Sequence, residues 1–247
     1  MKGNWKFLAI GGFAFALFLL ASLPASVLFD RMEPNQVYAS GLSGTVWRGS
    51  AAGIDVGGLQ LGGSTWRFKF LNLLRAEAAI DFTTEIGGET IAGSAGSRGP
   101  GHLRLVDVTG RIPVAELAAF LPTGFFSGTA EFDLAEVVID DSTPVAINGQ
   151  LLILNLTALT TRPPTTFGDF QVTFTDQQQV PLIGALSDLR GFIELNGQVE
   201  LGEDRSYTLE ATLSPRQGAP AQISSMLNFV GPDQGQGRRK LNLSGNL

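Results

Sequence analysis

The sequence predicts an all-β fold: a large curved antiparallel sheet or sandwich-like domain with one or two short helices, preceded by a single N-terminal transmembrane helix. Three observations support this prediction. Residues 7–29 contain no charged side chain, apolar residues recur with a period of two from about residue 41 onward, and glycine makes up 31 of 247 residues. A period of two places alternate side chains on opposite faces of a strand, and glycine supplies the tight turns between strands.

The N-terminal segment is predicted to be a membrane anchor. An apolar run over residues 7–29 is long enough to cross a hydrocarbon layer of about 30 Å as a helix. Lys2 and Lys6 precede the run and Asp30 follows it, so the positive-inside rule places the rest of the chain across the membrane.

We therefore assign residues 1–6 to a cytoplasmic N-terminus, 7–29 to a transmembrane helix, 30–40 to a connector and 41–247 to a periplasmic β domain. The alternative is a cleavable signal peptide, for which Ala21 and Ala25 around Pro24 supply small residues. The apolar run is longer than a signal core, and no clean A-x-A site follows it, so we favour a retained anchor.

The exported body is predicted to consist of strands joined by hairpin turns. Apolar and polar residues alternate over residues 78–83, 170–175, 195–201, 207–213 and 241–247, and glycines inside the last strands suggest a curved sheet. Turn residues lie between the apolar runs at Gly57-Gly58, Gly62-Gly63, Gly87-Gly88, Asp140-Asp141 and Glu203-Asp204. We expect a dozen or so strands in one continuous sheet, or alternatively two halves meeting near Pro163-Pro164.

Two short helices interrupt this pattern. Residues 114–121 lie between Pro113 and Pro122 and predict a helix of about two turns, with Leu117, Phe120 and Leu121 facing inward. A second short helix is predicted over residues 222–229.

The composition argues against most enzymes and against nucleic-acid binding. The chain has no cysteine and one histidine, His102, which leaves no thiol nucleophile, no cysteine-type zinc site and no imidazole cluster. The net charge is −6 and the isoelectric point is near 4.8, whereas a protein that binds nucleic acid needs a basic surface. We expect no catalytic residue, no metal and no cofactor.

A glycine-rich stretch over residues 93–101 lacks the Lys-Ser/Thr ending of a phosphate-binding loop, and a strand follows it rather than a helix. We interpret it as a hairpin loop that ends at a surface histidine, His102. The acidic pairs at residues 140–141 and 203–204 are interpreted as turn residues, because no third ligand stands at the spacing of a calcium loop.

Two Trp-Arg pairs are the candidate partner surface. Trp47 and Trp66 precede Arg48 and Arg67 near the start of the exported body. In a structural interpretation the two indoles are anchors in the core. In the functional interpretation these four residues line a surface that binds another protein. The basic run over residues 238–240 is interpreted as the guard of an edge strand.

Two segments resemble a known family. Leu42-Ser-Gly-Thr-Val-Trp-Arg-Gly49 is similar to the L-x-G-T-x-W-x-G segment that opens the periplasmic part of the type II secretion system protein N family (general secretion pathway protein N). Phe229-Val-Gly-Pro-Asp233, followed by Gly237-Arg238 and a strand over residues 241–247, resembles the closing segment of the same family. The anchor, the length and the acidic glycine-rich body extend the likeness over the whole chain.

The resemblance implies a non-enzymatic accessory component of the bacterial inner membrane, with a single span and most of the chain in the periplasm. Such a protein supports the export of folded proteins through an outer-membrane secretin, and its partners are other secretion subunits, either the inner-membrane platform or the secretin.

The alternative is an envelope protein similar to the AsmA-like and lipopolysaccharide-transport families. It would hold lipid in a β groove lined by residues such as Leu152, Leu154 and Leu156. A small-molecule ligand other than lipid is not expected.

Overall fold

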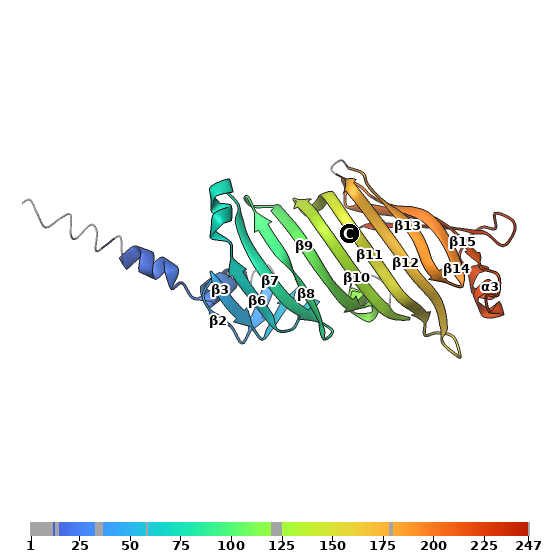
Figure 1. Ribbon diagram of the computed structural model, residues 1–247, viewed down its shortest axis with the longest axis horizontal. Helices are drawn as coiled ribbons and strands as arrows, with labels where there is room; N and C mark the ends of the chain where they lie inside the picture. Colours follow the sequence, from blue (N-terminus) through green and yellow to red (C-terminus); the bar gives the residue numbers. More distant parts are fainter. Residues whose placement is uncertain are drawn as a thin grey trace, which may run out of the picture.

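The computed structural model describes residues 12, 15–32, 37–57, 59–119, 125–177 and 180–246. Most of these residues form strands (Figure 1). Residues 15–21 are helical. The following elements, in chain order, are α2 (Ala25–Met32), β1 (Val37–Ser40), β2 (Ser43–Gly44), β3 (Arg48–Ala51), β4 (Gly53–Val56), β5 (Leu59–Leu61), β6 (Ser64–Phe68), η2 (Phe70–Arg75), β7 (Ala78–Ile86), β8 (Glu89–Ser97), β9 (His102–Pro113), η3 (Val114–Ala119), β10 (Phe126–Asp140), β11 (Thr143–Ala158), β12 (Thr165–Gln177), β13 (Leu182–Gly191), β14 (Ile193–Leu201), β15 (Ser206–Pro215), α3 (Ala221–Leu227) and β16 (Arg239–Asn246).

Thirteen strands of the described chain form one antiparallel sheet, in the order β16-β15-β14-β13-β12-β11-β10-β9-β8-β7-β6-β3-β2. A small second sheet has the order β1-β4-β5, and β1 falls within the expected connector. The prediction of one continuous curved sheet is confirmed. The alternative of two halves meeting at Pro163-Pro164 is wrong, because β11 and β12 pair along their length on both sides of these prolines.

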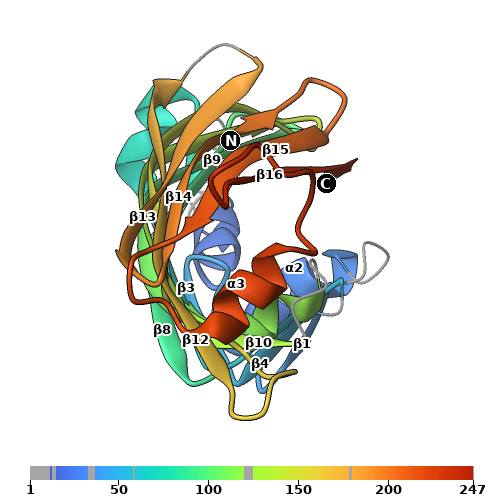
Figure 2. The same ribbon diagram turned by 90° about the vertical axis from the view of Figure 1, so that its right-hand side faces the viewer.

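The sheet curves strongly, with α2, α3 and the small sheet on its concave side (Figure 2). Part of the curvature comes from glycines that face each other across strands. Gly168 pairs with Gly191, with φ of +138° and +127°, beside a register shift at Asp169/Phe170. A Cβ on Gly168 would collide with the carbonyl oxygen of Arg190. Only glycine fits this close approach, as expected for a bent strand.

Two apolar clusters stabilise the concave face. At the C-terminal end, α3 inserts Ile223 and Leu227 against buried residues of β12 to β15, including Phe170 and Leu195. At the N-terminal end, β5 packs against a cluster formed by Ile86, Ile91 and Val108. The uncovered sheet would expose these side chains to water, at a cost of about 25 cal/mol per Å².

The two short helices differ in how well they were predicted. The helix predicted over residues 222–229 is confirmed as α3. The helix predicted over residues 114–121 is instead the 3-10 helix η3, because a segment this short gains little from the α-helical ladder. Leu117, Phe120 and Leu121 lie outside the residues whose side chains are described.

The predicted hairpin turns are confirmed at residues 87–88, 140–141 and 203–204. The prediction is wrong at residues 62–63, which join β5 of the small sheet to β6 of the large sheet, because these two strands do not pair with each other. Gly57 also lies in a hairpin turn, because β4 and β5 on either side of it pair with each other. Gly58 lies outside the described residues. The loop predicted over residues 93–101 is shorter than expected, because β8 continues to Ser97. Gly93 belongs to the strand, where a Cβ would meet the Val108 side chain at 2.7 Å.

The predicted anchor over residues 7–29 lies partly outside the described residues. Within the described part, the helical residues 15–21 end at Ser22, and Pro24 forms an isolated bridge with Thr45 before α2 begins. No helix among the described residues is both long enough and apolar enough to cross a membrane.

Replacing Ile223 should show how far the sheet depends on its helical cover. Ile223 is fully buried, so Ile223→Ala should lower the free energy of unfolding by about 2–5 kcal/mol, measured by urea denaturation. Gln222→Ala, on the exposed side of the same helix, is the control and should change it by less than about 0.5 kcal/mol. Equal effects of the two variants would contradict a packed role for α3.

Candidate functional site

The residues of the Leu42 to Gly49 motif form the first hairpin of the large sheet. β2 pairs with β3 through Gly44↔Gly49, and the Thr45 N–H donates to the Arg48 carbonyl at 2.9 Å. Gly44 has a φ of +84°, and a Cβ there would lie 2.5 Å from the Arg48 carbonyl oxygen. The turn therefore requires glycine at this position.

Trp47 joins this hairpin to two other parts of the chain. Its indole N–H donates to the Leu20 carbonyl at 2.7 Å, at the end of the helical residues 15–21. Its ring packs edge-on against Phe68 and tilted against Phe70, with centroid distances of 5.1 and 5.3 Å. The half-buried indole thus ties the N-terminal helix to β6 and η2.

Trp66 lies on the concave face, the same face as its cross-strand partner Phe82. Its indole N–H donates to the Thr45 carbonyl at 3.2 Å, and its ring packs against Phe29 of α2 at 5.7 Å. A Cβ on Gly49 would lie 2.5 Å from the Trp66 ring. The last motif glycine therefore leaves the space that this indole occupies.

An apolar cavity of about 320 Å³ adjoins Trp66 between the large sheet, the small sheet and α2. Ser64 and Thr84 in its wall share a hydrogen bond of 2.6 Å, so their hydroxyls are satisfied. The other residues around the cavity are Phe29, Val46, Ile54, Leu61, Thr65, Ile80, Phe82 and Thr83.

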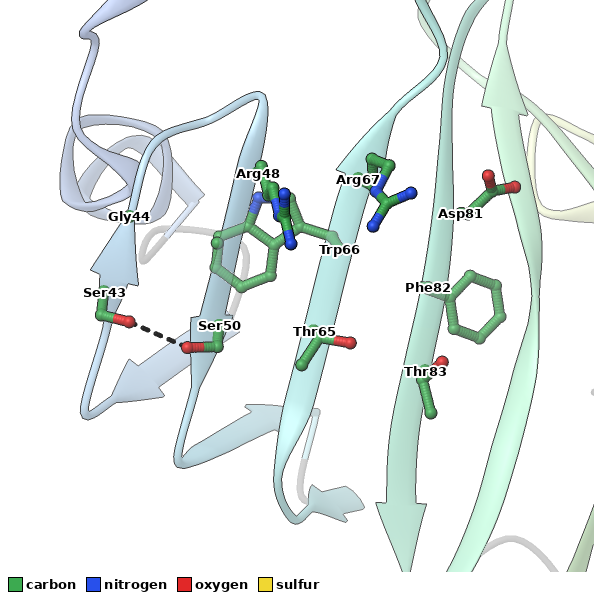
Figure 3. Close-up of a pocket in the computed structure, with 11 residues that line it drawn as sticks. Ser43, Gly44, Arg48, Ser50, Thr65, Trp66, Arg67, Asp81, Phe82 and Thr83 are labelled. Carbon is green, nitrogen blue, oxygen red and sulfur yellow. Dashed lines mark hydrogen bonds between the residues drawn. The ribbon is translucent and has the colours of Figure 1, made fainter.

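Arg48 and Arg67 occupy the opposite, convex face of the same strands (Figure 3). They are direct cross-strand partners in the β3–β6 ladder, and both are exposed. They line an open groove of about 630 Å³, which we call the arginine groove. Its other lining residues are Ser43, Gly44, Gly49, Ser50, Thr65, Trp66, Asp81, Phe82 and Thr83.

Asp81 follows Arg67 in the same cross-strand row. The Ser94 hydroxyl donates to Asp81 Oδ1 at 2.6 Å, and Lys69 Nζ lies 3.0 Å from the same oxygen. The Ser94 hydrogen bond, helped by the charges of Lys69 and Arg67, holds the pKa of Asp81 below its usual value. Asp81 is thus compensated mainly by Lys69, and within the described chain neither Arg48 nor Arg67 forms an ion pair of 4 Å or less.

The arginine groove has the chemistry of an anion site. Two guanidiniums lie beside the hydroxyls of Ser43, Ser50 and Thr65, and the fork of a guanidinium matches a carboxylate or phosphate. Metal binding is a different matter: the described residues contain no group of three or more acidic or histidine side chains that could hold an ion.

The family model for "Type II secretion system (T2SS), protein N" matches residues 35–242. This chain belongs to the type II secretion system protein N family. Three proteins named "Type II secretion system protein N" are each 26% identical to it. They come from Aeromonas hydrophila (95% of each chain covered), Vibrio cholerae (97% of this chain and 99% of the relative) and Pectobacterium carotovorum (95% and 94%). No solved structure matches the chain significantly.

The match to protein N includes the whole opening segment and the closing segment as far as residue 242. It begins before β1 and ends within β16, so the arginine groove lies inside it. In this member of the protein N family the opening motif has a structural explanation, since Gly44, Trp47 and Gly49 shape the hairpin that carries Arg48.

The basic run lies on β16, the edge strand, as predicted. Arg239 pairs with Asp233 at 3.3 Å, and Lys240 pairs with Glu210 at 3.5 Å. This end of the edge strand is covered by residues 232–234, since the Lys240 N–H donates to the Pro232 carbonyl at 3.2 Å and Asp233 forms an isolated bridge with Arg239. The guarding role therefore stays a prediction.

His102 differs from the expected surface residue. It begins β9 opposite Asp140 and is half-buried, and its Nδ1 is buried without a hydrogen-bond partner in the described structure. The exposure was overestimated because sequence alone does not show that the Asp140-Asp141 turn packs beside it.

Leu152 and Leu154 were expected to line a groove together with Leu156. Leu152 instead pairs with Glu131 and Gln171, which places it on the convex face. Leu156 packs into the C-terminal core cluster. A bulge beside Leu156 breaks the alternation, and bulges of this kind have no clear sequence signal.

Two surface features, the arginine groove and η2, have only a weak sequence signal. Asp81 and the hydroxyl residues of the arginine groove could be placed on a polar strand face by alternation, but their neighbours depend on strand order. The apolar residues of η2 lack a period of two, which is the only sign that they do not belong to a strand.

Gly49→Ala should destabilise the protein, because the added methyl group meets the Trp66 ring and the Ser43 carbonyl. Overpacking of this kind costs about 1–3 kcal/mol, which urea denaturation measures. Gly99→Ala is the control, since a Cβ at Gly99 meets nothing within 4 Å. A Gly49→Ala variant as stable as Gly99→Ala would contradict the packing described for the motif.

Proposed function

We propose that this protein N family member is a non-enzymatic accessory subunit of the type II secretion machinery. In this proposal the apolar run that begins at residue 7 anchors it in the inner membrane, and the β body lies on the periplasmic side. The end of the run, at Ala25 and Phe29 of α2, packs against that body. The arginine groove binds an acidic segment of another secretion subunit, from the inner-membrane platform or the secretin. The observation that carries the proposal is the cross-strand pair Arg48↔Arg67 without an ion-pair partner in the described chain.

Like charges placed directly opposite each other destabilise a sheet. Arg48 and Arg67 stand in that relation on an exposed face, and Asp81, on the other side of Arg67 in the same row, forms its ion pair with Lys69. A carboxylate supplied by a partner would relieve the repulsion and accept two hydrogen bonds from each guanidinium. The groove therefore suits an acidic protein segment.

The proposed membrane topology rests on the length of the N-terminal apolar run and on the charges that flank it. Lys2 and Lys6 flank the apolar run on one side, and Asp30 follows on the other. This pattern supports a cytoplasmic N-terminus and an exported body.

Charge reversal tests the groove. The double variant Arg48→Glu with Arg67→Glu should weaken partner binding about tenfold to a hundredfold and reduce export of folded proteins. Its urea unfolding midpoint should fall only slightly, because the two introduced carboxylates repel each other as the guanidiniums did and the one at position 67 also faces Asp81. Arg98→Glu, an exposed residue of the β8–β9 loop, is the matched control. Normal secretion by the double variant would contradict the proposal.

The partner itself can be identified by crosslinking. Because the chain has no cysteine, Thr65→Cys places a single thiol in the groove. A crosslinker in the native envelope should then capture a secretion subunit, and this capture should fall when Arg48 and Arg67 are reversed.

A second candidate function is favoured by the apolar cavity beside Trp66, whose size is at the lower end for ligand pockets. In that case the protein holds one acyl chain, as a lipid-binding envelope protein would. Native mass spectrometry of the full chain should then show one retained phospholipid, which Leu61→Trp removes by filling the cavity. Gln60→Trp, the neighbouring exposed residue, should retain it. Absence of lipid from both variants and from the unmodified chain would contradict this second function.

A further inference from the structure

The 3-10 helix η2, between β6 and β7, presents an unusual concentration of exposed apolar side chains. Leu71 is 80% exposed and Leu74 is 86% exposed, and Phe70 and Leu73 are each more than half exposed. No residue of η2 is buried. These leucines therefore contribute little to the core, and an exposed apolar patch of this kind marks an interaction site.

The turn holds these side chains in a defined position. Ala76 closes η2 in the left-handed conformation with a φ of +54°, and its N–H bonds to the carbonyls of Asn72 and Leu73. The Glu77 N–H donates to the Asn72 carbonyl at 3.2 Å, and the Glu77 side chain is buried beside Arg104. The apolar side chains are thus presented by a well-bonded turn.

η2 lies at the same end of the molecule as the N-terminal helix, as the teal helical turn in Figure 1 shows. Trp47 connects the two, because its ring packs against Phe70 while its indole N–H bonds to the Leu20 carbonyl. The helical residues next to Leu20 are also exposed and apolar, with Phe18 at 67%. The η2 patch is therefore continuous with the uncharged N-terminal run.

We infer that η2 is a second membrane contact, which inserts Leu71 and Leu74 into the surface of the lipid bilayer beside the N-terminal segment. The inference rests on the proposed anchor. It commits to lipid because the patch adjoins a run of 23 residues without charge. Arg75 lies in the last turn of η2 and is exposed, and a basic side chain in that position reaches lipid phosphates while the leucines enter the acyl boundary.

Two contacts constrain a body more than one does. A single helix lets the exported sheet swing about the membrane surface, whereas a second contact limits its tilt. Because η2 connects β6 to β7, the same strands carry Arg67 and Asp81 of the arginine groove. The groove would then be held at a constant height above the bilayer.

The experiment uses the full chain in vesicles of phosphatidylethanolamine and phosphatidylglycerol. Since the chain has no cysteine, single cysteines can be introduced and labelled with an environment-sensitive fluorophore at three sites: Leu74→Cys reports on η2, Phe18→Cys on the anchor, and Phe229→Cys is the matched control. Phe229 is 90% exposed and lies at the opposite end of the sheet, after α3.

The Leu74 and Phe18 labels should both shift their emission to shorter wavelength. The Leu74 label should lose intensity to lipids with a nitroxide near the headgroup, and the Phe18 label, at the middle of the apolar run, to lipids with a nitroxide deep in the acyl chain. The Phe229 label should keep its aqueous emission. The label at Leu71→Cys should show the same emission shift and quenching as the label at Leu74→Cys. Agreement between the two sites shows that the result does not depend on the position of one label.

Each other outcome has a definite meaning. Quenching at Phe18 without quenching at Leu74 overturns the inference and leaves the anchor intact. A blue-shifted Leu74 label that lipid nitroxides do not quench overturns it in favour of a protein contact or a second copy of the chain. Quenching at neither site overturns both this inference and the proposed anchor.

Discussion

The structure depends on an unbroken antiparallel ladder in which every inner strand of the large sheet is hydrogen-bonded on both sides. Backbone groups inside a folded chain must be paired, and this ladder pairs them with only short connections. The cost is one long apolar face with no second sheet of similar size to cover it. Two core clusters cover parts of this face, one under α3 at one end and one under β5 at the other. Paired glycines such as Gly168 and Gly191 let the sheet bend round these covering elements.

The alternation of strands gives the first hairpin two different surfaces. On the concave side Trp66 packs over Gly49 and borders an apolar cavity. On the convex side, the neighbouring residues Arg48 and Arg67 stand exposed in an open groove. A single short motif therefore shapes both a structural contact and a charged surface, because successive side chains along a strand point to opposite faces.

The two ends of the sheet differ in the polarity of the side chains that gather there. At one end Trp47 ties the N-terminal helix to the first hairpin and to η2, so apolar surface gathers there. At the other end, the edge strand β16 carries Arg239 and Lys240, each paired with an acidic residue of a neighbouring segment. Exposed apolar groups therefore gather at one end of the sheet and paired charges at the other.

Much of the fold could be predicted from the sequence, because its signals are local. Alternation at Phe170 to Phe174, paired turn residues such as Gly87-Gly88, and the apolar period of α3 depend on near neighbours, and the chain's membership of the protein N family is read from motif residues. Other features required the tertiary structure. The extent of β8 past Gly93, the 3-10 form of η3, the burial of His102 and the opposite facing of Leu152 depend on bulges and on contacts between distant strands. The arginine pair has the same origin: the sequence placed Arg48 and Arg67 on polar strand faces, but only the β3–β6 register puts one guanidinium directly opposite the other, because register is decided by which strands meet and not by either strand alone.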